Sequence, residues 1–217
     1  MENPKIIMEC AEMFEKYYDR MSYPNNREEL HSLDKDDMQK WKDFYFEELK
    51  KCPDIQDYTF FEPETGEKNE NTGVGRDGIF SVFEYCNIRY QLYKHLVKKM
   101  FGFIDVQLPV IGEVPVVDFI SMLESYVPQF AHKGVSDTHL ASFVPEHRKM
   151  WDAFYELNEK MHLISDGEFF GNTSANPNYG IGKDGAFFGV ELLHFLGNCY
   201  KYIWDKLTQT IGGKFYA

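Results

Sequence analysis

The sequence predicts a mainly α-helical protein of two tandem homologous units, residues 1–108 and 109–217, which we expect to pack as one globular body. Two observations support this class. Apolar residues recur every three or four positions in several long segments, which predicts about three helices in each unit. Several sequence blocks of the first unit also recur in the same order in the second. Short extended pieces are expected to flank a Gly-rich loop in each unit.

The duplication is clearest where residues 71–84 align without gaps on residues 178–191. Further blocks lie upstream in the same order in both units, and their separation along the chain is nearly the same. They are Trp41-x-x-Phe44-Tyr45 with Trp151-x-x-Phe154-Tyr155, Phe60-Phe61 with Phe169-Phe170, and Met13-Phe14-Glu15-x-Tyr17 with Met122-Leu123-Glu124-x-Tyr126.

The first helix of each unit is predicted from apolar residues at helical spacing. These are Ile7, Ala11, Phe14, Tyr18 and Met21 in the first unit, and Val116, Ile120, Leu123, Val127 and Phe130 in the second. The second helix is expected to start near Asp34 as N-cap in the first unit and near Pro145-Glu146 in the second, because Asp and Pro favour helix starts.

The third helix carries the clearest apolar stripe, and it continues the gapless alignment of the two units. The stripe consists of Tyr85, Ile88, Leu92, Leu96 and Met100, matched by Leu192, Phe195, Cys199, Ile203 and Leu207. Extended pieces are expected at Phe60-Phe61 and Ile79-Phe80. Aromatic pairs such as Phe187-Phe188 are expected to fill the core.

Composition excludes several classes of protein. With 43% apolar and 17% aromatic residues the chain can fill a core, so it is not a disordered protein. Its formal net charge of −12 repels phosphate and anionic lipid, so we expect no nucleic-acid partner and favour a basic or amphipathic protein segment. Acidic residues and prolines interrupt residues 101–120, so we expect no membrane span. Scattered cysteines and no signal-peptide pattern favour a cytoplasmic location.

The most distinctive motif is Asn-x-Gly-x-Gly-[Arg/Lys]-Asp-Gly-x-Phe-x-x-x-Glu, which occurs twice and runs into the third helix each time. Counted from Gly73, it places Asp77 at position 5, Gly78 at position 6 and Glu84 at position 12. Residues 180–191 repeat this pattern. The motif resembles the second half of an EF-hand loop, in which those positions hold a carboxylate, a turn glycine and a bidentate glutamate.

The EF-hand resemblance implies calcium as the bound ion. It assigns Asp77, Glu84, Asp184 and Glu191 as side-chain ligands, with Asn71 and Asn178 as additional oxygen donors. Glycines stand at positions 1 and 3, where EF-hands carry acidic or amide side chains. Calcium takes roughly six to eight oxygen ligands, and backbone carbonyls and water would then have to supply many of them. The binding is therefore expected to be weak.

Three other interpretations of these segments stay open. The loop glycines match a phosphate-binding Gly-x-Gly-x-x-Gly fingerprint. Glu191-x-x-His194, with Glu15 and Glu124, has the spacing of a carboxylate-bridged metal site in a helical bundle. Purely structurally, Asp77 and Asp184 would act as helix N-caps and the motif glutamates would tie the loops down by hydrogen bonds.

The preferred function is therefore a non-enzymatic, EF-hand-like protein that binds calcium weakly or serves as a protein-interaction module. No nucleophile motif of convincing context is present, so no catalytic residue is assigned. The alternative is a metal-dependent or small-ligand-binding helical enzyme with its site between the two units.

Overall fold

The computed structural model describes residues 2–18, 30–57, 73–101, 110–111, 114–130, 139–166 and 180–211. Over these residues the protein is mainly helical, which confirms the predicted class. The helices are α1 (Pro4–Glu15), α3 (Lys35–Asp43), α4 (Val82–Phe101), α5 (Val116–Glu124), α6 (Val127–Phe130), α7 (Pro145–Met161) and α8 (Gly189–Ile211). A π-helical turn, Phe44–Glu48, and a 3₁₀ turn, Leu49–Lys51, continue α3.

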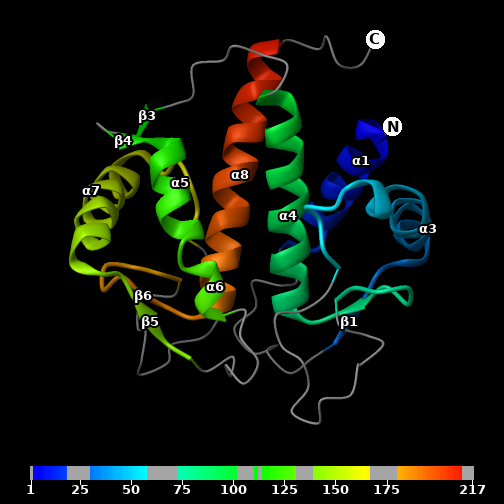
Figure 1. The fold of residues 1–217 in the computed structure, drawn as a ribbon, viewed down its shortest axis with the longest axis horizontal. Coiled ribbons are helices and arrows are strands. Elements are labelled where there is room, and N and C mark those ends of the chain that lie inside the picture. Colours follow the sequence, from blue (N-terminus) through cyan, green and yellow to red (C-terminus); the bar gives the residue numbers. More distant parts are fainter. Residues whose placement is uncertain are drawn as a thin grey trace.

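Helices α4 and α8 lie side by side at the centre of the molecule, with α1 and α3 on one side and α5, α6 and α7 on the other (Figure 1). Gly197 on α8 faces α4. A Cβ atom at that position would lie 3.7 Å from the Cα atom of Tyr90 on α4, an ordinary van der Waals distance. The central pair therefore joins the elements that come from residues 1–108 to those from residues 109–217.

The helix starts predicted near Asp34 and Pro145 agree with the structure, and α1 begins with a comparable cap. Asn3 caps α1 by accepting a hydrogen bond from the Lys5 amide at 3.2 Å, and Pro4 follows as its first residue. Asp34 is the N-cap residue of α3, although its side chain does not accept the capping bond. Helix α7 begins at Pro145, where proline's fixed φ fits the first turn.

One predicted helix is wrong in its extent. The stripe from Val116 to Phe130 predicts a single helix, but the structure breaks it into α5 and α6. Pro128 explains the break, because it has no N–H for the carbonyl of Glu124 and its ring crowds that carbonyl. In the first half α1 ends at Glu15, and Met21 lies outside the described residues.

Within the described ranges, the strands form three short antiparallel pairs. His31–Ser32 (β1) pairs with Ile79–Phe80 (β2), and Ala141–Ser142 (β5) pairs with Ala186–Phe187 (β6). Val110–Ile111 (β3) pairs with Val114–Pro115 (β4). The extended piece expected at Ile79-Phe80 is confirmed, whereas Phe60-Phe61 and Phe169-Phe170 lie outside the described residues.

The core runs along both sides of α4 and α8. Every residue of the two predicted stripes is buried, and so is the aromatic pair Phe187-Phe188. Burial extends well beyond the stripes, however, because each central helix is covered by its partner as well as by the outer helices. Polar residues of α4 such as Asn87, Arg89 and Gln91 are buried in consequence. Among the described helices, none is both long and apolar enough to cross a bilayer.

Candidate functional site

The Gly-rich loop of the first half wraps around a carboxylate of the protein itself. Gly73, Gly75 and Gly78 have positive φ angles of 96°, 57° and 66°, a backbone conformation that glycine adopts easily and that makes the tight turns of the loop. The amides of Val74 and Gly75 donate to the carboxylate of Asp57 at 2.7 and 2.8 Å. Burial raises the pKa of Asp57 to about 6, although these two hydrogen bonds act in the opposite direction.

The second half repeats this arrangement around Asp166. The amides of Ile181 and Gly182 donate to its carboxylate at 3.1 and 2.7 Å. Burial raises the pKa of Asp166 to about 7. Indole N–H groups brace both loops, since Trp41 donates to the Gly75 carbonyl at 2.6 Å and Trp151 to that of Gly182 at 2.7 Å. The N–H donors that a phosphate would need are therefore used inside the protein.

The predicted ligand Glu84 lies in the first turn of α4 and accepts two backbone hydrogen bonds. Its carboxylate binds the amide of Gly73 at 2.9 Å and that of Ser81 at 2.6 Å, while the Ser81 hydroxyl accepts from the Glu84 amide at 3.3 Å. This is a capping box. Glu191 makes the matching bond to the Phe188 amide at 2.8 Å. Burial raises the pKa of Glu84.

Asp77 and Asp184 each stabilise the turn that leads into a strand. Asp77 accepts from the Ile79 amide at 3.1 Å, and Asp184 accepts from the Ala186 amide at 3.0 Å. The expectation that they are helix N-caps is wrong, because Ser81 holds the capping position of α4 and α8 begins only at Gly189. The predicted donors Asn71 and Asn178 lie outside the described residues.

These loop carboxylates thus have hydrogen-bonding roles that do not depend on an ion, and calcium binding stays a prediction. In the part of the chain that the structure describes, one set of three metal-ligating side chains brings its ligand atoms within 4.8 Å of one another, namely Glu2, Cys52 and His95. Neither loop contributes to that set.

The other predicted metal cluster, around Glu191-x-x-His194, is divided among separate contacts. His194 is buried, and its Nε2 atom lies 3.0 Å from Asn198 Nδ2 and 3.2 Å from the Tyr18 hydroxyl. Burial lowers the pKa of His194 well below its usual value. Glu15 pairs with Arg89 instead, and Glu191 caps α8. His194 therefore belongs to a polar network that links α8 to Tyr18, just after the end of α1.

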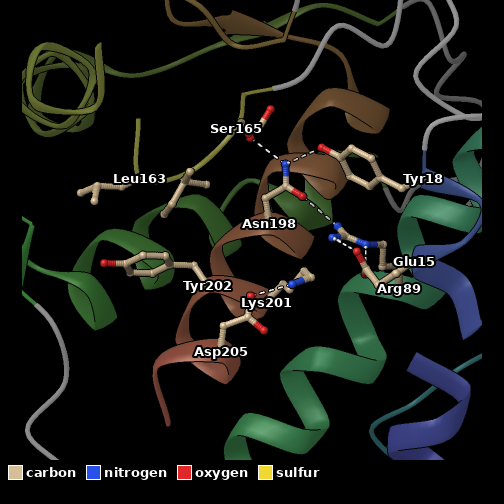
Figure 2. A pocket seen from close by; sticks show the side chains of 10 residues that line it. Glu15, Tyr18, Arg89, Leu163, Ser165, Asn198, Lys201, Tyr202 and Asp205 are labelled. Carbon is tan, nitrogen blue, oxygen red and sulfur yellow. Dashed lines mark hydrogen bonds and ion pairs between the residues drawn. The ribbon is translucent and has the colours of Figure 1, made fainter. Parts of the chain in front are cut away.

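That network borders a cavity of about 250 Å³, which we name the central cavity (Figure 2). Its walls come from both halves of the chain: the end of α1, the middle of α4, the segment after α7 and the middle of α8. The lining residues are Glu15, Tyr18, Arg89, Leu163, Ile164, Ser165, Asn198, Lys201, Tyr202 and Asp205. The cavity lies between the two predicted units.

Hydrogen bonds hold the side chain of Arg89 in place at the central cavity. Its Nε and Nη2 atoms donate to the two carboxylate oxygens of Glu15 at 2.7 and 3.2 Å, and Nη1 donates to Asn198 Oδ1 at 2.9 Å (Figure 2). The guanidinium also lies 5.0 Å from the centre of the Tyr18 ring. Asn198 in turn donates to the Ser165 carbonyl at 2.6 Å. These bonds hold the guanidinium in one orientation. The Arg89 side chain is only 1% exposed.

The corresponding place in the second half is filled by aromatic side chains. Glu124, the match of Glu15, accepts hydrogen bonds from Tyr90 at 2.7 Å and Tyr200 at 2.9 Å, and pairs with Lys94 at 2.7 Å. When the gapless alignment of the two loops is continued along the helices, Tyr90 corresponds to Gly197. A Cβ atom at Gly197 would lie 2.9 Å from the Nη1 atom of the arginine. The glycine therefore leaves room for the guanidinium beside the cavity.

Charge and exposure vary along the central cavity. Among the described lining residues, two are acidic and two are basic, so their formal charges sum to zero. The chain as a whole has a formal net charge of −12. Lys201 pairs with Asp205 at 2.6 Å, and these side chains are 32% and 45% exposed. The cavity thus leads from a rim at Lys201 and Asp205 to a floor at the buried Arg89.

Sequence reasoning missed the residues that organise both features. Asp57 and Asp166 have the same separation along the chain as the neighbouring Phe-Phe blocks, so extending the alignment would have found them. Arg89 and Gly197 mark places where the two halves differ. A search limited to matched residues excludes them.

Comparisons with protein-family models, with curated protein sequences and with solved structures give no match to this chain. Its function therefore has to be inferred from its own geometry.

Proposed function

We propose that the protein binds a small zwitterionic ligand of the amino-acid type in the central cavity. The observation that carries the proposal is the guanidinium of Arg89, held by Glu15 and Asn198 at the floor of a polar cavity between the two halves of the chain. Formation of ligand sites between helices is common in bundles.

The floor suits a carboxylate. Among the described residues, Arg89 uses three of its five N–H groups in hydrogen bonds. Its side chain is buried, so a ligand would have to displace lining side chains to reach the other two. A guanidinium presents these donors in a planar fork that matches a carboxylate. Because the guanidinium is already held in one orientation, binding does not incur the entropic cost of ordering it.

The rim and the walls suit the rest of such a ligand. Asp205 and Glu15 carry the negative charge that an ammonium group requires, and Lys201 balances it. The carboxylate and ammonium groups of a zwitterion can each pair with an oppositely charged side chain of the cavity, so no buried charge is left uncompensated. A simple cation or anion would leave one charge without a partner. Leu163 and Ile164 provide an apolar wall for an aliphatic portion.

The size of the cavity limits the ligand. A volume of about 250 Å³ is equivalent to about eight water molecules at roughly 30 Å³ each, so a molecule of about eight to ten non-hydrogen atoms fits. Free amino acids are in this range.

The test is a thermal-shift screen of free amino acids at millimolar concentration, followed by titration calorimetry of those that raise the melting temperature. We expect one site per chain. Arg89→Lys keeps the charge but loses the planar fork, so affinity should fall about tenfold to a hundredfold, because one charge-assisted hydrogen bond contributes about 1.5–3 kcal/mol.

Arg148→Lys provides a control for the same chemical change. Arg148 makes a more exposed 2.7 Å ion pair with Asp152 on α7 and donates to the carbonyls of Lys183 and Asp184, away from the residues that line the cavity. Affinity should be unchanged in this variant. Equal loss of affinity in both variants, or no thermal shift with any amino acid, would contradict the proposal.

A further inference from the structure

A second cluster of side chains lies near the start of α1. Glu2, Cys52 and His95 bring a carboxylate oxygen, a thiol sulfur and an imidazole nitrogen within 4.8 Å of one another. Glu2 precedes α1, Cys52 follows the 3₁₀ turn Leu49–Lys51, and His95 is on α4. Three elements distant in sequence therefore converge on one point.

We propose that Glu2, Cys52 and His95 form a binding site for a divalent transition ion such as Zn²⁺. Thiolate, imidazole and carboxylate are the ligand types that zinc takes, and three protein ligands leave a fourth position for water. Calcium and magnesium prefer sets of oxygen ligands, so this site is distinct in chemistry from the one predicted in the Gly-rich loops.

The imidazole of His95 provides an independent indication. The side chain is 1% exposed, and among the described residues its Nε2 atom has no hydrogen-bond partner. A buried polar atom without a partner is costly. Nε2 faces Glu2 Oε2 at 3.4 Å, on the side of the ring where the metal would lie. An ion bound there would satisfy it.

The other ring nitrogen is already oriented as in many zinc sites. His95 Nδ1 lies 2.8 and 2.9 Å from the two carboxylate oxygens of Asp54. A carboxylate that holds one nitrogen of a metal-binding histidine fixes the ring and makes the opposite nitrogen a better ligand. Asp54 thus serves as the outer partner of His95.

Hydrogen bonds and an ion pair hold the segments that carry the remaining ligands in place. The Asn3 amide donates to Glu48 at 2.8 Å, and Lys51 pairs with the same carboxylate at 2.8 Å, which fixes the segment that carries Glu2 against the turn before Cys52. The Cys52 amide donates to the Leu49 carbonyl at 3.0 Å. Ligand atoms of a tetrahedral zinc site lie about 3.3–3.8 Å apart for bonds of about 2.0–2.3 Å, so a side-chain adjustment of about 1 Å closes the site.

A lysine competes with the metal. Lys99 Nζ pairs with Glu2 Oε2 at 2.8 Å, and its side chain is 49% exposed. A bound ion would replace this ammonium, which can turn into solvent. Removing the lysine should therefore strengthen metal binding, an effect that a purely structural ion pair would not produce.

The test uses Co²⁺ as a probe on the full chain freed of metal with a chelator. Wild type should bind one Co²⁺ per chain with a thiolate-to-cobalt charge-transfer band, and Zn²⁺ should displace it. Cys52→Ser should lose the band, whereas Cys86→Ser, which removes another buried thiol, should keep it. Melting in chelator shows whether each variant folds.

Two gentler variants keep the proposal testable if Cys52→Ser does not fold. Asp54→Asn should weaken Co²⁺ binding about tenfold to a hundredfold, as expected for an outer-partner change. Lys99→Met should tighten it severalfold. A wild type that shows no charge-transfer band, or a band that Cys52→Ser retains, would overturn the proposal, as would a Lys99→Met variant with weaker binding.

Discussion

Replacing Asp166 with asparagine should make the protein more stable above neutral pH. Burial raises the pKa of this carboxyl from 3.8 to about 7, so the folded state holds the proton more tightly than the unfolded state does. The contribution of this carboxyl to the free energy of unfolding is therefore fully present at low pH. It declines as the pH rises from about 4 to about 7 and is lost above that. Asparagine has nearly the shape of the protonated acid and has no charge to bury.

The magnitude follows from the size of the shift. A difference of about three pKa units corresponds to about 4 kcal/mol, since one unit is about 1.4 kcal/mol. Asparagine keeps one acceptor oxygen but turns an amide donor toward the other loop N–H, which costs about 1–3 kcal/mol at every pH. Asp166→Asn should therefore be less stable than wild type by that amount near pH 4, and should gain up to about 4 kcal/mol relative to wild type by pH 8, for a net stabilisation of about 1–3 kcal/mol. Asp57, whose pKa rises to about 6, should give the same trend with about 3 kcal/mol.

Urea denaturation at unit pH intervals, followed by tryptophan fluorescence, measures this directly. The Trp151 indole donates to Gly182, within the loop that Asp166 organises, so the probe is local as well as global. Exposed Asp36→Asn controls for the removal of one negative charge. If Asp166→Asn is less stable than wild type at pH 8, the hydrogen bonds from Ile181 and Gly182 outweigh the cost of burial and the reasoning fails.

Two further predictions concern the central helices and the loops. Gly197→Ala should leave the free energy of unfolding within about 1–2 kcal/mol of wild type in urea denaturation, because the higher helix propensity of alanine, about 1 kcal/mol, offsets the loss of the displaced Arg89 hydrogen bond. Amino-acid affinity should fall at least tenfold in calorimetry. Unchanged affinity would contradict the placement of the ligand. If the loops bind calcium, millimolar calcium raises the melting temperature of wild type and not of a Glu84→Gln, Glu191→Gln double variant. Without calcium that variant should still be less stable by about 1–3 kcal/mol per lost acceptor; a fully stable variant would refute the capping role.

Local signals predicted much of the fold. Proline at position 145 and the Asp at position 34 mark helix starts, because the chemistry of a cap depends on only a few neighbouring residues. The stripes of the two long helices predicted their buried faces for the same reason. Pro128 also carries a local signal, but the apolar spacing continues undisturbed on either side of it, so the stripe alone predicts one helix.

Long-range contacts were not predictable in this way. The carboxylate that fills the first Gly-rich loop comes from Asp57, which is 17 residues before its partner Val74. The central cavity depends on Arg89 and Asn198, which are 109 residues apart on helices that meet only in the fold. Hydrophobic periodicity gives no information about which helix packs against which, so the polar residues buried between α4 and α8 could not be assigned.

The most direct test of the account follows the Arg89 side chain itself by NMR. The Nε–H signal of Arg89 and the amide signal of Gly197 would be recorded while the amino acid with the largest thermal shift is added. Saturable shifts of both signals, with those of the Gly-rich loop at residues 180–185 unchanged, are the predicted result. Shifts confined to the loops, with Arg89 unaffected, would place the ligand elsewhere and contradict the central claim.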